Sequence, residues 1–269
     1  MNEILLAAVD GCRGGWVIAQ AACSSLAGDK HERVVSSEGT SHQPEMRVRA
    51  GSLRLTYVRE FGDVLQCTED CESVLVDMPI GLSGGDDSAQ KGGATDKSWP
   101  RACDIAAKEA LKGKRSSLFL APPRGTLGAE NPRDFQQLHR QITGVGASLP
   151  VWGIVPKIVE VDLQLTPEVQ RKVHEFHPEL AWCRLAGRSL AKKRSREGAE
   201  QRWRILRQWF DDSDLESAEH WRDDFRGKIG EDDLLDALVG IVSGLTLGRF
   251  RLPTTPSRDA RGLLMEIYY

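Results

Sequence analysis

The stretch of residues 4–19, ILLAAVDGCRGGWVIA, constrains the fold of this chain more than any other segment. Its first apolar run has no polar alternation, which is typical of a strand buried on both faces in the middle of a sheet. The run stops at a single acid, Asp10, and a second apolar run begins at Trp16 after a glycine-rich turn. Two short β-type runs around such a turn predict a hairpin. We therefore expect Asp10 at the end of a central strand, beside glycines that let a phosphate or a metal approach the backbone, unless the acid only helps the chain to reverse.

A second apolar run that ends on an acid occupies residues 73–77, SVLVD. Pro79 and Gly81 follow it, a proline that cannot donate to a sheet ladder and a glycine that permits a sharp turn. We expect this run to be another buried strand with Asp77 at its end. Further strands are expected over 53–58, 151–155, 173–176 and 263–268.

Helical patterns occupy much of the remaining chain. Helices are expected over 61–69, 101–111, 132–142, 178–186 and 231–247, and 197–210 carries apolar residues at roughly helical spacing. Prolines stand near the first turn of two of these segments, where they are best tolerated. The segment 231–247 is the longest apolar-periodic one, and its acids cluster in the first two turns, as suits a helix N-terminus.

The size and charge of the chain exclude several classes of protein. With 269 residues, 40% hydrophobic and 28% charged, it has the composition of a globular protein with a substantial core. We expect a single domain over 1–269, with a polar insertion near 22–52 and a helical or loop insertion near 84–150. The net charge of −3 means that nucleic acid can be attracted only by a local basic patch. A secretory signal pattern and an apolar run of about 20 residues are both missing, so we expect a cytoplasmic protein with no membrane contact.

Three acids lie at the start of the apolar helix 231–247, namely Asp232, Asp233 and Asp236. Asp233 and Asp236 are three residues apart and share a helix face with the apolar residues that must pack on the sheet. An acid on that side is costly unless a positive charge pairs with it. Mg²⁺ is a natural partner, and two such ions about 4 Å apart would activate a water and stabilise the leaving oxygen of a phosphodiester. Alternatively the acids complement the helix dipole, which explains Asp232 better than Asp236.

A second group of ionisable residues lies in the segment HEFHPE at 174–179. Glu175 falls on the opposite strand face from its neighbours, and Glu179 falls in the first turn of the next helix. Either carboxylate could complete a metal shell, and His177 could be a ligand or a proton carrier. The alternative is a helix-capping carboxylate with a hydrogen-bonded histidine.

A basic segment at 184–207 holds nine Lys or Arg residues against two Glu. Its residues Lys192, Lys193, Arg194 and Arg196 could neutralise the phosphates of a nucleic acid. The alternative for each of them is a solvated loop or helix face.

Several motifs occur in order along nearly the whole chain. They are VDGCRGGW at 9–16, VDMPIGL at 76–82, RACDIAAKEAL and SLFLAPPR within 101–124, PKIVEVD at 156–162, EFHPELAW at 175–182, KK-x4-G-x3-R at 192–202, DDLLDALV at 232–239 and GLLMEIYY at 262–269. With them the chain resembles an uncharacterised domain-of-unknown-function family (family 429) of predicted nucleases with a ribonuclease H-like fold.

The resemblance implies an α/β fold like that of Holliday-junction resolvases: a mixed sheet flanked by helices, with loop and helix insertions. In the resolvases, a first-strand acid, a later strand-end acid and two acids three apart on the last helix bind two Mg²⁺ ions. Carried over to this chain, these ligands are Asp10, Asp77, Asp233 and Asp236, with Asp232 as the alternate if the register differs by one. Glu175 and Glu179 have no clear counterpart there.

The expected function is a nuclease that depends on Mg²⁺ or Mn²⁺ and acts on DNA or RNA. The candidate catalytic residues are Asp10, Asp77, Glu175, Glu179, Lys193, Asp233 and Asp236, with Lys193 or Lys192 steadying the charge on the phosphate. One alternative is an actin-like or sugar-kinase-like phosphotransferase or ATPase, whose first hairpin turn at 11–15 would cradle phosphates. The other is a binding module of the same fold that has lost catalysis.

Overall fold

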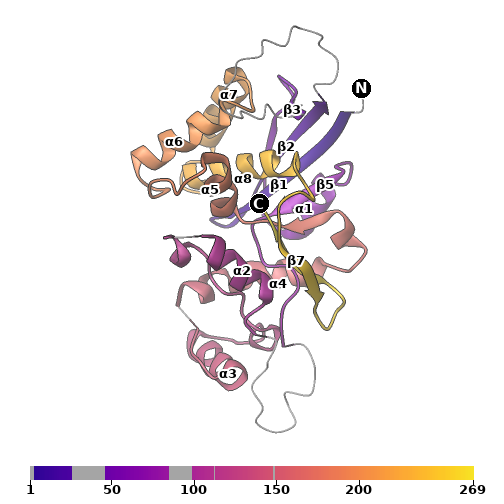
Figure 1. The fold of residues 1–269 in the computed structure, drawn as a ribbon, viewed down its shortest axis with the longest axis vertical. Coiled ribbons are helices and arrows are strands. Elements are labelled where there is room, and N and C mark those ends of the chain that lie inside the picture. The colour runs from indigo at the N-terminus through magenta and orange to yellow at the C-terminus, as the bar shows by residue number, and fades with distance from the viewer. Residues whose placement is uncertain (1–2, 26–45, 85–98, 112, 148) are drawn as a thin grey trace, which may run out of the picture.

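The computed structural model describes residues 3–25, 46–84, 99–111, 113–147 and 149–269. Its centre is a six-stranded mixed sheet in the order β3-β2-β1-β5-β6, with β4 also paired to β2 (Figure 1). The pairs of β2 with β1, β3 and β4 are antiparallel, whereas β1–β5 and β5–β6 are parallel. The strands are β1 (Glu3–Cys12), β2 (Gly15–Ser25), β3 (Met46–Val48), β4 (Arg54–Val58), β5 (Ser73–Val76) and β6 (Val173–Glu175). The described chain is therefore an α/β protein built on a mixed sheet flanked by helices.

Helices cover both faces of this sheet. They are α1 (Phe61–Cys67), α2 (Ala102–Ala110), α3 (Pro132–Thr143), α4 (Leu149–Gln164), α5 (Pro178–Ala186), α6 (Arg196–Leu206), α7 (Asp212–Asp224) and α8 (Glu231–Gly244), with short 3₁₀ turns η2 (Arg115–Ser117), η3 (Arg124–Thr126) and η4 (Val169–Arg171). Leu6 and Ala8 of β1 pack in one core with α5, α6 and α8, whereas Ala7 and Val9 pack in a second core with α1 and α4. β1 is thus buried on both faces, as its unbroken apolar run predicts.

The first hairpin extends further than its sequence suggests. We expected the strand to stop at Asp10, but β1 continues to Cys12, which pairs with Gly15 of β2. The turn needs only two residues, and Gly14 takes the positive φ of 76° that such turns favour. On the other side β5 pairs with β1 only as far as Val9. Asp10 therefore lies one residue beyond the parallel ladder, at the open end of the sheet.

The strand expected over 151–155 is wrong, because these residues lie in α4. The buried side chains of this helix, Val151, Val155 and Ile158, recur every three or four residues and pack as one helical face. A short apolar run rich in valine does not by itself separate a strand from a buried helix.

The other expected elements are found close to their expected bounds. The helix expected over 178–186 coincides with α5, and the closing strand is β8 (Leu264–Tyr268). That strand pairs with β7 (Arg251–Arg258) in a separate two-stranded sheet, and a bridge from Tyr268 to Phe176 connects it to the main sheet. Of the polar stretch 22–52, residues 22–25 belong to β2 and 46–48 to β3. Residues 26–45, and residues 85–98 of the insertion expected near 84–150, lie outside the described part of the chain.

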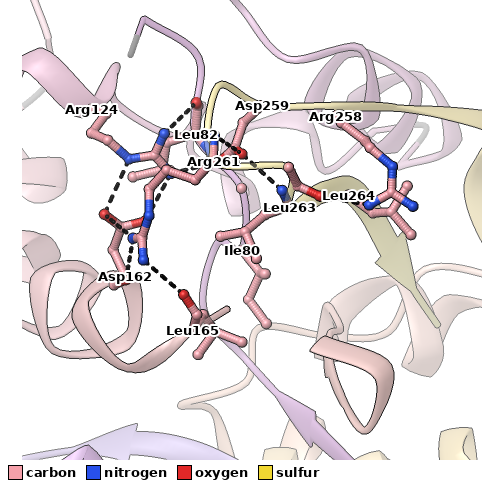
Figure 2. A network of polar contacts seen from close by, with 12 residues as sticks. Ile80, Leu82, Arg124, Asp162, Leu165, Arg258, Asp259, Arg261, Leu263 and Leu264 are labelled. Carbon is pink, nitrogen blue, oxygen red and sulfur yellow. Dashed lines mark hydrogen bonds and ion pairs between the residues drawn. The ribbon is translucent and has the colours of Figure 1, made fainter. Parts of the chain in front are cut away.

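A network of ion pairs ties α4 and η3 to the loop between β7 and β8 (Figure 2). Arg124 bridges Asp162, at 2.9 Å, and Asp259, at 2.5 Å. Asp259, whose side chain is fully buried, also accepts a hydrogen bond from the backbone N–H of Leu82. Arg261 contacts Asp162 at 3.1 Å. The network therefore fixes the path of the chain as it leaves Asp77. Within the described residues, no helix is both long and apolar enough to cross a membrane.

Candidate functional site

A cleft of about 1010 Å³ opens where β1, β5 and β6 end. Because the ends of neighbouring strands meet at one edge of a sheet, residues far apart in the chain converge there. All the candidate catalytic residues of the sequence, with the alternate Asp232, line this cleft: Asp10, Asp77, Glu175, Glu179, Lys193, Asp232, Asp233 and Asp236. Of the four candidate phosphate contacts, Lys192, Lys193 and Arg194 line it, whereas Arg196 does not and pairs with Glu200. Their surroundings differ, however, and divide them into a core group and a set of paired structural charges.

Asp10 and Asp77 form the centre of the site. The backbone N–H of Asp77 donates to the carbonyl of Val9 at 2.9 Å, which places Asp77 beside Asp10 in the cleft. Burial, with the nearby charges of Asp77 and Asp236, raises the pKa of Asp10 well above its usual value. Burial and the charge of Asp236 raise the pKa of Asp77 to about 7. Burial and neighbouring acids thus make both carboxyl groups harder to ionise than free aspartates.

Glycines on α8 bring the third acid to this pair. A Cβ added at Gly240 would lie 2.4 Å from Ala8 of β1, and one added at Gly244 would lie 3.1 Å from Leu6. These glycines share a helix face with Asp236, at four-residue spacing. The close approach of α8 to β1 therefore places Asp236, which is 4% exposed, next to Asp10.

Both carboxylate oxygens of Asp236 have partners. The indole N–H of Trp182 donates to Oδ1 at 2.9 Å, and the ammonium of Lys193 donates to Oδ2 at 3.0 Å. Trp182 is fully buried, so it fixes the orientation of the carboxylate. Lys193 comes from the basic segment and has a side chain that is 43% exposed, so it reaches the acids from the solvent side.

Asp232 and Asp233 lie at the rim of the acid group. The carboxylate of Asp233 accepts a hydrogen bond from the N–H of Gly230 at 2.8 Å and so caps its own helix. Burial still raises the pKa of Asp233 to about 6. Asp232 instead pairs with Arg194 at 3.2 Å and with Lys193 at 3.5 Å.

Glu175 is held by a buried ion pair. Arg101, which is 1% exposed, donates to both of its oxygens at 2.8 Å, and the N–H of Ile80 donates at 2.7 Å. Arg101 also contacts Asp104 at 2.6 Å. Since three donors occupy the carboxylate of Glu175, we assign it to holding α2 against β6 and leave it out of the proposed metal ligands.

Glu179 is also paired on both oxygens. Lys114 contacts Oε1 at 2.5 Å, and the fully buried Arg202 of α6 contacts Oε2 at 2.9 Å. Next to it, His177 precedes α5 and lines the cleft, and its buried Nδ1 has no hydrogen-bond partner within the part of the chain that the structure describes. Burial lowers the pKa of His177, so the ring is neutral. An unpartnered nitrogen in a cleft wall is available to a bound molecule.

The structure adds cleft residues that the sequence did not single out. Lys157 of α4 lies 4.0 Å above the ring of Trp16 and donates to the carbonyl of Gly15 at 2.5 Å. Phe119, which is 43% exposed, stands in the wall formed by 113–122. Lys157 and Phe119 both fall inside motifs of the resemblance, and that was the only signal that could have found them.

The residues present fit a divalent cation by their chemistry. Carboxylates are the ligands that Mg²⁺ prefers, and the raised pKa values of Asp10, Asp77 and Asp233 show a site short of positive charge. Within the described residues, however, no three Asp, Glu, His or Cys side chains are arranged closely enough to chelate one ion. Mg²⁺ usually keeps several waters and takes only one or two carboxylates directly, so it does not require such a chelate.

Fold and site together define an α/β protein with an acidic cleft at the end of a mixed sheet. The chain belongs to the family described as "Protein of unknown function (DUF429)", which matches residues 9–259. The resemblance to this domain-of-unknown-function family is thereby confirmed. Searches of curated proteins and of solved structures found no match.

Proposed function

We propose that this protein is a metal-dependent nuclease with a ribonuclease H-like fold. Support for the fold comes from the strand order β4-β2-β1-β5-β6, in which β4–β2 and β2–β1 are antiparallel pairs and β5 and β6 continue the sheet in parallel with β1. The observation that carries the function is the meeting of Asp10, Asp77 and Asp236, from three separate elements, in one cleft lined by lysines.

The chain's own residues would divide the work as follows. Asp10, Asp77 and Asp236, with Asp233 at the rim, would hold Mg²⁺ or Mn²⁺, which lowers the pKa of water and stabilises charge on a phosphate. Trp182 would keep Asp236 in position through its 2.9 Å hydrogen bond. The ammonium of Lys193, which contacts Asp236 in this structure, would move to the phosphate of the substrate. There it would neutralise the charge that develops during cleavage.

The phosphotransferase alternative is less well supported. That activity needs a loop with free backbone N–H groups around the phosphates. Here Gly11 and Cys12 are paired with β2, and a Cβ added at Gly15 would lie 2.2 Å from the carbonyl of Val58. The hairpin glycines thus serve close packing. The third possibility, a binding module without catalysis, makes the same demand on the acids and differs only in the outcome of a cleavage assay.

Two measurements on the whole protein test the proposal. Crystals soaked in Mn²⁺ should give anomalous scattering between Asp10, Asp77 and Asp236. The protein should also cleave labelled DNA or RNA when Mg²⁺ or Mn²⁺ is added, and stop when the metal is chelated. Metal binding without cleavage of any nucleic acid would favour the inactive binding module. Nucleotide bound at 11–15 would favour the phosphotransferase.

A further inference from the structure

A second hollow, of about 520 Å³, lies on the exposed face of α3. Its lining consists of Pro132, Arg133, Gln136, Gln137, Arg140, Gln141 and Leu149. The Arg and Gln residues recur at three- and four-residue spacing, so they form one stripe along the helix. The lining is thus cationic and amide-rich, with donors suited to phosphate oxygens and to base edges.

The arginines of this stripe are available for binding. Arg133 and Arg140 are exposed, and none of the described ion pairs or hydrogen bonds uses their guanidinium groups. Elsewhere in the described chain many arginines are paired with acids, as Arg196 is with Glu200 at 2.7 Å. The guanidinium groups of Arg133 and Arg140 are therefore free to bind a ligand that occupies the hollow.

The loop after α3 folds back against two residues of the stripe. The amide of Gln136 donates to the carbonyl of Ala147. A Cβ added at Gly146 would lie 3.0 Å from Gln136 and 3.3 Å from Arg140, so this loop runs against the stripe. The chain then enters α4 at Leu149, which is 69% exposed and closes the hollow.

One face of α4 connects this hollow with the acidic cleft. Leu149 lines the hollow, whereas Gly153 and Lys157 line the cleft. The three residues are spaced by four and therefore lie on one helix face. At 1.5 Å per residue, the path from Leu149 to Lys157 is about 12 Å long. A polymer that lies in the cleft can follow this face to α3.

We infer that the α3 stripe is a second contact for a polynucleotide strand, continuous with the acidic cleft along α4. This inference rests on the proposed function and extends it, because it makes the substrate a strand several nucleotides long. Arg133 and Arg140 bind phosphates outside the cleft, and the glutamines contact sugars or bases. Single strands are bound by such grooves that follow the backbone.

The test compares a long and a short oligonucleotide. Fluorescence anisotropy measures binding of labelled single strands of about 20 and about 4 nucleotides. Ca²⁺ replaces Mg²⁺ to keep the acids occupied by a cation of similar ligand preference. The double variant Arg133→Ala/Arg140→Ala is compared with wild type over a range of salt concentrations. The matched control is Arg47→Ala/Arg54→Ala, which removes two exposed arginines from β3 and β4.

The stripe variant should bind the long strand about tenfold more weakly and lower its salt slope by about 1.4, two phosphate contacts at about 0.7 each. Its affinity for the short strand should equal that of wild type, and the control should equal wild type for both. A stripe variant that binds the long strand as wild type does overturns the second contact and leaves the proposed function intact. Failure of the wild type to bind either strand overturns both. If wild type also binds poly-glutamate and the stripe variant loses this binding to the same extent, the surface is a contact for an acidic peptide instead.

Discussion

The ammonium of Lys193 lies 3.0 Å from the carboxylate of Asp236, the acid that α8 presses furthest into the sheet. The same lysine lowers the pKa of Asp77, although burial and the charge of Asp236 outweigh it. Without a divalent ion, the ammonium of Lys193 is thus the positive charge that pairs with Asp236. A metal that binds to Asp236 has to compete with it.

Replacing Lys193 with methionine should therefore separate metal binding from cleavage. Lys193→Met should bind Mn²⁺ about tenfold more tightly, or about 1.4 kcal/mol, because no ammonium has to be displaced. Cleavage should nevertheless become slower, since the charge on the phosphate is no longer neutralised. Mn²⁺ binding is measured by electron paramagnetic resonance and cleavage under saturating metal.

The neighbouring lysine gives a matched control. Lys192 lines the cleft but forms none of the described ion pairs with the acids. Lys192→Met should therefore leave Mn²⁺ affinity unchanged. Equal or weaker Mn²⁺ binding by Lys193→Met would show that the lysine does not compete with the metal.

The helix acids should differ sharply in their effect on cleavage. Asp236→Asn and Asp10→Asn should each lose at least the roughly 100-fold that removal of a group supporting a metal costs. Asp232→Asn should cleave nearly as well as wild type, because its carboxylate pairs with Arg194 at the rim. Initial rates at saturating Mg²⁺ measure the three variants. If Asp232→Asn loses activity while Asp236→Asn keeps it, the register of the site is wrong by one turn.

The acid pair should also make the metal-free protein less stable at high pH. The pKa of Asp77 is 3.8 in an unfolded chain and about 7 in the folded protein. Its contribution to stability is complete below 3.8 and is lost as the pH rises through about 7. The slope is up to about 1.4 kcal/mol per pH unit, because the folded state binds the proton that the unfolded state has released.

Asp77→Asn isolates this effect. In a chelator at pH 8, the variant should be more stable than wild type, and the difference should shrink towards pH 4. Thermal unfolding measures it, at about 2–4 °C for each kcal/mol. Adding Mg²⁺ at pH 8 should stabilise wild type and not the variant. Glu109→Gln, which removes an exposed acid from α2, is the control and should follow wild type at each pH. Parallel curves for Asp77→Asn and wild type would contradict the shifted pKa.

The elements predicted best from the sequence are those whose ends carry residues typical of helix or strand termini. The bounds of α5 are correct because Pro178 fits a first helical turn and Gly187, with a φ of 65°, ends the helix. The 16-residue α4 was misread in part, because its valines and isoleucines resemble a buried strand in a short window. Its helical period becomes visible only over the whole segment.

The acids of the site were predictable for a topological reason. Asp10 and Asp77 each follow an apolar strand run, and strand ends meet at one edge of a sheet. Their partners were not predictable in the same way. Arg101 meets Glu175 across 74 positions, and Lys157 reaches the hairpin across 142. Contacts at such separations leave no periodic signal in one sequence, so the sequence left open whether Glu175 completes a metal shell or has a structural role.

Comparing variants of Glu175 and Asp10 should distinguish an acid that stabilises the fold from an acid that binds the metal. Glu175→Gln removes one of the two carboxylates that Arg101 contacts and leaves Asp104 as its partner, so it should lower the free energy of unfolding by about 1–3 kcal/mol, the cost of losing a buried hydrogen-bond acceptor. Its Mn²⁺ affinity should stay at the wild-type value wherever the protein is folded. Asp10→Asn should do the reverse, losing Mn²⁺ and keeping or gaining stability, because it removes a carboxyl whose charge is opposed by its neighbours. Urea unfolding and Mn²⁺ titration on both variants test the pair. Loss of Mn²⁺ binding by folded Glu175→Gln would show that Glu175 is a metal ligand.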